Sequence, residues 1–81
     1  MFTVYTKQNC SQCIMAKNLL SSKNIDFSTV EIDYGTPIDG EKISREDFMS
    51  KFPGVRELPM IVENDVAIGG YKSLVSHLKD R

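Results

Sequence analysis

The chain has 81 residues, of which 41% are hydrophobic and 26% are charged, and its formal net charge is −1. This size and composition are typical of one small globular domain, so we expect a single domain over residues 1–81. The balanced charge excludes an electrostatic attraction to nucleic acid or to an anionic membrane, and neither is expected as a partner.

The first half of the chain predicts a strand, a helix and a second strand. The hydrophobic run at residues 2–6 has the pattern of a strand, and a polar cluster follows it. A helix is expected over residues 11–23, where apolar side chains recur at helical spacing without Gly or Pro. Residues 27–32 are rich in β-branched and aromatic side chains, which predicts a second strand.

The second half predicts a helix, a hairpin and a last helix. Residues 41–52 have an amphipathic helical pattern that must end before a Pro-Gly pair. Residues 60–63 and 66–68 are separated by Asn-Asp and form a predicted hairpin. A Gly-Gly pair then precedes a helix over residues 71–79. The side chains expected in the core of this half include Phe48, Met49 and Met60.

The resulting order is β-α-β-α-β-β-α, which places the chain in the α/β class. Two strands joined by a helix run parallel with a right-handed crossover, whereas a hairpin adds antiparallel neighbours. We therefore expect one four-stranded mixed sheet flanked by three helices on its two faces. No apolar stretch is long enough to span a membrane, and the first residues predict a strand rather than a signal segment, so we expect a cytoplasmic monomer.

The only two cysteines, Cys10 and Cys13, form a C-x-x-C motif between the first strand and the first helix. A disulfide between residues three apart closes a very small loop and is a poor structural cross-link. A zinc site needs four ligands, and His77 lies far away in the sequence, so no metal is expected. Dithiol exchange fits this motif beside a βαβ pattern better than either alternative.

The two cysteines are expected to differ in reactivity. The start of the helix and Lys7 would stabilise the thiolate of Cys10, since both present positive charge. Cys13, one turn further into the helix, would be more buried and would remain a thiol. This difference suits an exchange in which Cys10 attacks and Cys13 resolves the mixed disulfide.

Pro59 directly precedes the predicted hairpin and allows two interpretations. It is compatible with the first residue of an edge strand. Alternatively, it forms a cis-proline turn that faces the cysteines and leaves the backbone of Leu58 free to pair with an extended substrate.

Three segments, "VYTKQNCSQC", "LPMIV" and "IGGYKSL", together resemble the glutaredoxin family of the thioredoxin-like superfamily. The resemblance covers nearly the whole chain, and in length it is most similar to small dithiol glutaredoxins of bacteriophages. It implies the reduction of protein disulfides and glutathione mixed disulfides, with glutathione as the co-substrate. The implied partners are therefore glutathione and disulfide-containing client proteins.

The resemblance also implies roles for individual residues. Cys10 would be the nucleophile and Cys13 the resolving thiol. The residues at the positions that bind glutathione in the family are Lys7, Gln12, Arg56, Leu58, Pro59, Gly70, Tyr71 and Lys72. The N–H groups at the start of the last helix would receive a carboxylate, as helix N-termini do for anions. The simpler interpretation of Gly69 and Gly70 is a turn with positive φ.

Two alternative functions remain open. The family usually has an aromatic residue at the position of Gln12, and C-S-Q-C is closer to the redoxins that serve ribonucleotide reductase. Those redoxins take their electrons from thioredoxin reductase. A third interpretation is an iron–sulfur cluster carrier, in which two chains hold the cluster through Cys10 and glutathione.

Overall fold

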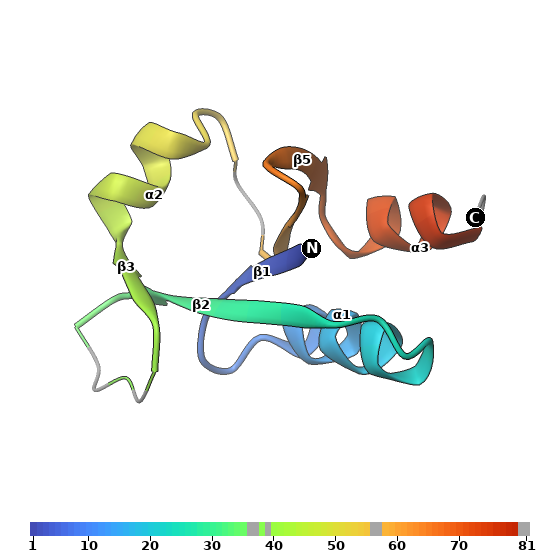
Figure 1. Ribbon diagram of the computed structural model, residues 1–81. Coiled ribbons are helices and arrows are strands. Elements are labelled where there is room, and N and C mark those ends of the chain that lie inside the picture. The colour runs from blue at the N-terminus through green and yellow to red at the C-terminus, as the bar shows by residue number, and fades with distance from the viewer. Residues whose placement is uncertain (36–37, 39, 56–57, 80–81) are drawn as a thin grey trace.

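The computed structural model describes residues 1–35, 38, 40–55 and 58–79 (Figure 1). Within these residues the strands are β1 (Phe2–Thr6), β2 (Phe27–Asp33), β3 (Lys42–Ser44), β4 (Met60–Glu63) and β5 (Val66–Gly69). The helices are α1 (Ser11–Ser22), α2 (Arg45–Lys51) and α3 (Tyr71–Lys79). The strands form one mixed sheet in the order β3-β2-β1-β4-β5.

Strand β1 occupies the centre of this sheet. It runs parallel to β2, with Thr6 opposite Glu31, and antiparallel to β4, with Tyr5 opposite Met60. Strands β4 and β5 form the predicted antiparallel hairpin. The α/β class and the mixed sheet expected from the sequence are therefore confirmed. Because β1 lies between β2 and β4, the segment that follows β1 begins in the middle of the sheet.

Alternating side chains of the sheet fill two separate cores, one on each face. The first core joins α1 and α3 to the sheet through Phe2, Val4, Ala16, Leu20, Ile61, Leu74 and Leu78. The second lies under α2 and contains Tyr5, Ile32, Phe48, Met60 and Val62. Helices thus cover both faces, as predicted, and Figure 1 shows α2 apart from α1 and α3. None of the helices in the described part of the chain is long and apolar enough to cross a membrane.

The expected four-stranded sheet and the helix over residues 41–52 need correction. Residues 42–44 are extended and pair with β2, which gives the sheet a fifth strand. The helix begins only at Arg45, because the Ser44 hydroxyl accepts a hydrogen bond from the Asp47 N–H at 3.1 Å and caps it. Ile43, which fitted a helical pattern, instead packs against the second core from β3.

Met49 is a second correction. Phe48 and Met60 are buried as expected, at 4% and 6% exposure, but Met49 is 48% exposed. Helix α2 is only seven residues long and buries Phe48. Met49, the next residue, projects about 100° away around the helix and therefore lies outside the core.

Candidate redox site

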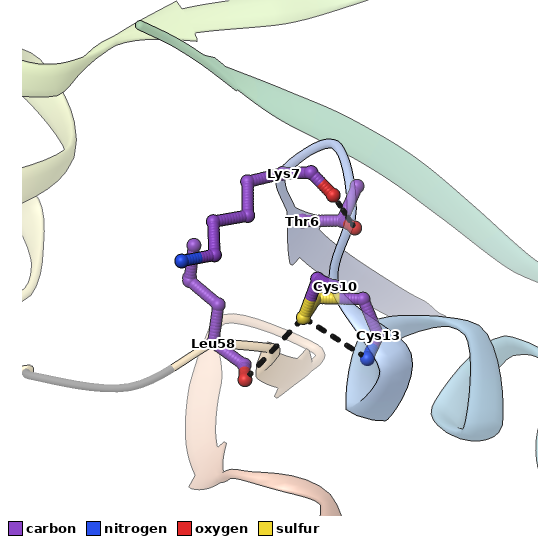
Figure 2. Close-up of a disulfide and its surroundings, with 5 residues drawn as sticks. All are labelled: Thr6, Lys7, Cys10, Cys13 and Leu58. Carbon is purple, nitrogen blue, oxygen red and sulfur yellow. Dashed lines mark hydrogen bonds between the residues drawn. A yellow bond between two sulfur atoms is a disulfide. The ribbon is translucent and has the colours of Figure 1, made fainter.

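The cysteine motif joins the end of the central strand to the start of α1. Asn9 has a positive φ of 57°, and Cys10 follows in an extended conformation as the N-cap residue of α1. This turn reverses the chain after β1 and begins the helix at Ser11. Cys10 and Cys13 are joined by a disulfide, with their Cα atoms 5.2 Å apart (Figure 2).

The two cysteines differ in exposure in the predicted direction. Cys10 is 8% exposed, whereas Cys13 is fully buried. The backbone N–H of Cys13 donates to the sulfur of Cys10 at 3.2 Å. In the reduced protein, the same N–H would favour the thiolate of Cys10, because hydrogen bonds to a charged form stabilise that form. The geometry therefore suits Cys10 as the attacking sulfur.

The segment before β4 faces this motif. The Leu58–Pro59 peptide bond is cis, as one of the two sequence interpretations expected, and the Pro59 ring is buried. The sulfur of Cys10 lies 3.7 Å from the carbonyl oxygen of Leu58 (Figure 2). Pairing of β1 with β4 thus places a backbone polar group beside the sulfur that would react.

The start of α3 lies against the same segment. A Cβ atom added at Gly70 would lie 3.7 Å from the carbonyl oxygen of Pro59. The carbonyl of Gly70 accepts a hydrogen bond from Leu74 N–H at 3.0 Å, which makes it the first acceptor of the helix. Tyr71 packs its side chain against the first core, and Lys72 is exposed. Of the predicted α3 residues, Gly70 thus lies beside the cis-proline segment.

The remaining predicted residues are less closely gathered. Lys7 is exposed, and Figure 2 shows its side chain pointing toward the segment that contains Leu58. Gln12 is exposed in the first turn of α1. Arg56 lies outside the described residues. Tyr34, which the sequence did not suggest for the site, lines a hollow together with Lys7. Only the pairing of β2 with β1, which is a tertiary contact, could have indicated this neighbour.

His77, considered above as a metal ligand, has other partners. Its Nε2 atom lies 2.7 Å from a carboxylate oxygen of Glu63, and its ring meets Phe2 edge-on. Among the residues that the structure describes, no group of three or more His, Cys, Asp or Glu side chains is placed to hold a metal ion. The interactions of His77 therefore join α3 to β4 through Glu63 and to β1 through Phe2.

Comparison with known proteins identifies the family. The glutaredoxin family model matches residues 2–68. Bovine "Glutaredoxin-2, mitochondrial" is 36% identical over 70 residues, which are 83% of this chain but only 40% of that protein. "Glutaredoxin-like protein NrdH" of Lactococcus lactis subsp. cremoris is 35% identical over 74 residues, 89% of each chain.

The fold agrees with these sequence matches. The crystal structure of "Glutaredoxin 1 from Francisella tularensis Complexed with Cacodylate" superimposes with a TM-score of 0.73 at 25% identity. The match covers 98% of this chain and 92% of that one. With its redox-active Cys10–Cys13 pair on a thioredoxin-like fold, the chain belongs to the glutaredoxin family.

Proposed function

We propose that this glutaredoxin is a glutathione-dependent thiol–disulfide oxidoreductase that reduces protein disulfides and glutathione mixed disulfides. The observation that carries the proposal is the setting of Cys10. Its sulfur accepts a hydrogen bond from the Cys13 N–H at the start of α1 and lies 3.7 Å from the carbonyl oxygen of Leu58. A reactive sulfur beside the backbone carbonyl of a cis-proline segment suits a disulfide held in an extended peptide.

The reaction proceeds by two exchanges at sulfur. The Cys10 thiolate attacks one sulfur of the substrate disulfide, forms a mixed disulfide and releases the other half as a thiolate, which takes up a proton. Cys13 then loses its proton and attacks the Cys10 sulfur, which releases the second half of the substrate. Two glutathione molecules reverse these steps, restore both thiols and leave as oxidised glutathione.

Backbone groups around Cys10 supply the proposed glutathione contacts. The backbone of Leu58 would pair with the cysteinyl part of the tripeptide. Because α3 begins after Gly70, the N–H groups of Tyr71 and Lys72 have no acceptor one turn earlier in the helix and suit a carboxylate. The exposed ammonium of Lys7 would meet the other carboxylate.

The alternative is an electron carrier to ribonucleotide reductase that thioredoxin reductase reduces. Two observations favour it: Gln12 within the motif, and the similarity to the Lactococcus protein over 89% of both chains. The two proposals share the chemistry of the cysteines and differ in the electron donor.

The donor experiment separates them. The oxidised protein is mixed either with glutathione or with thioredoxin reductase and NADPH, and the appearance of free thiols is followed. We expect reduction by glutathione; reduction by thioredoxin reductase alone would establish the alternative instead.

Single-cysteine variants test the order of the two exchanges. Cys10→Ser should lose all activity, because the accessible sulfur is gone. Cys13→Ser should still remove glutathione from mixed disulfides but should no longer reduce protein disulfides. An active Cys10→Ser variant would reverse the assignment.

A further inference from the structure

One buried carboxylate has no part in the reaction described above. Among the residues that the structure describes, the Oε2 atom of Glu31 is the buried side-chain oxygen that has no hydrogen-bond partner. A carboxylate oxygen that leaves water normally gains such a partner, because its burial is otherwise costly. The surroundings of Glu31 should therefore explain why a carboxylate is placed there.

Glu31 lies on the face of the sheet that α1 and α3 cover. Its neighbours on β2, Val30 and Ile32, pack in the second core, and successive side chains of a strand point to opposite faces. The Glu31 side chain therefore points to the face of the first core. Phe27, four residues earlier on β2, packs against that first core, which agrees with this alternation.

On this face, Glu31 lies at the end of the sheet where the redox pair begins α1. In the parallel pairing of β1 and β2 its partner is Thr6, one strand spacing of about 4.8 Å away. Thr6 is buried and belongs to the surroundings of the disulfide in Figure 2. Only residues 7–10 separate β1 from α1, so the first turn of α1 lies at this end. Cys13 is the first buried side chain of that helix.

The positive charges on neighbouring elements leave this oxygen without a partner. Lys42 is opposite Glu31 on β3 and is exposed, and Lys17 follows Cys13 by one turn of α1. Neither side chain donates a hydrogen bond to Oε2. The carboxylate thus retains an acceptor in the buried space between the sheet and the start of α1.

The proposed reaction needs a proton acceptor in that space. Cys13 is 0% exposed, and it must lose a proton to attack the Cys10 sulfur. We propose that the Glu31 carboxylate accepts the proton of Cys13, directly or through one water molecule, in the step that resolves the mixed disulfide. This inference rests on the proposed function and adds a residue to its second exchange.

The step balances in atoms and electrons. The S–H bond of Cys13 breaks, and its proton passes to Oε2 of Glu31. The electron pair on the Cys13 sulfur forms the bond to the Cys10 sulfur, and the bond from Cys10 to the substrate sulfur breaks. The released thiolate then takes the proton from Glu31. The two cysteines are oxidised, and the substrate disulfide is reduced.

A quenched-flow experiment separates the two exchanges. The pre-reduced protein is mixed with an excess of oxidised glutathione or, in parallel, of bis(2-hydroxyethyl) disulfide, stopped with acid and analysed by mass spectrometry. Formation of the mixed disulfide at Cys10 reports the first exchange, and its loss reports the second. Glu31→Gln should leave the first rate unchanged and slow the second about a hundredfold, as removal of a general base does. The matched control is Glu41→Gln, at an exposed carboxyl directly before β3.

Two further readouts distinguish proton transfer from a structural effect. Raising the pH should reduce the deficit of Glu31→Gln, because a Cys13 that is already ionised needs no acceptor. Glu31→Asp, which keeps the carboxylate but draws it back, should show a smaller deficit in the second exchange alone. The urea midpoint of Glu31→Gln should be no lower than that of the control, since a neutral amide of the same shape replaces an unpartnered carboxylate.

The remaining outcomes have distinct meanings. An unchanged second rate, an equal slowing of both rates, or a deficit that does not vary with pH would overturn the inference. If only bis(2-hydroxyethyl) disulfide reacts with the unaltered protein, the glutathione part of the proposed function fails, and the same variants still test Glu31. If neither disulfide reacts, the proposed function and the inference both fail.

Discussion

Gly69 and Gly70 are adjacent, yet only one of them is required by the backbone. Gly69 has a φ of 125°, and a Cβ atom there would lie 2.7 Å from the Ser73 hydroxyl oxygen. Gly70 has room for a Cβ atom, with the Pro59 carbonyl oxygen at 3.7 Å. The turn interpretation of the pair therefore applies to Gly69. The turn does not require a glycine at position 70, so the interpretation of Gly70 as part of the proposed glutathione site stays a prediction.

Alanine substitution should separate these two glycines. Gly69→Ala should lower the free energy of unfolding by about 1–3 kcal/mol, because it combines an unfavourable φ with a steric clash. Gly70→Ala should change it by less than about 0.5 kcal/mol. Urea denaturation followed by circular dichroism measures both. Equal losses of stability in the two variants would show that the contrast is wrong.

Individual residues also show where a sequence pattern stops being informative. The cysteines, Leu58 and Pro59 were predicted because spacing and order along the chain define them. Tyr71 was predicted for its N–H group, but its side chain packs against the first core. The exposure of Met49 depends on which face of α2 packs against the second core, and that face is set by tertiary contacts of Phe48 rather than by composition.

Among the elements, β3 and α2 were predicted least well because they share one junction. Ser44 ends β3 and caps α2 through the Asp47 N–H. An isolated three-residue strand has almost no pattern of its own, and its pairing with β2 gives it its conformation. The predicted bounds of β1, β2, α1 and α3 agree with the structure to within one residue.

The cap can be tested by substitution at Ser44. Ser44→Ala should lower the free energy of unfolding by about 1 kcal/mol, since the Asp47 N–H loses its acceptor. Ser44→Asp should retain the cap and most of the stability. The control is Ser76→Ala, at an exposed position within α3. Chemical denaturation of the three variants gives the comparison, and a Ser44→Ala protein as stable as the control would exclude the cap as the reason for the helix start.

At the scale of the whole molecule, the redox pair follows the most enclosed strand. Strand β1 is hydrogen bonded on both sides, and β3 and β5 form the edges. The class, the mixed sheet and the helix-covered faces followed from element order, because βαβ units and hairpins have fixed handedness or direction. The single domain, the cytoplasmic location and the monomeric state stay predictions from composition.

This arrangement predicts a gradient of stability across the sheet. Backbone amides of β1 and β4 should exchange with solvent most slowly, with opening free energies close to that of global unfolding. Amides of β3 should exchange fastest among the strands, because this edge strand has three residues. Native-state hydrogen exchange measured by NMR resolves the strands, and protection of β3 equal to that of β1 would contradict the gradient.

The pairing of β1 with β4 has a consequence for changes in chain length. Tyr5 lies opposite Met60, and this register brings Cys10 and Leu58 together from segments 48 residues apart. One inserted residue in either strand would shift the backbone by about 3.3 Å and reverse the direction of every later side chain. An insertion at the Asn64–Asp65 turn would leave that register unchanged. Deletions and insertions at the turn should therefore preserve the redox site, whereas those within β1 or β4 should separate its two halves.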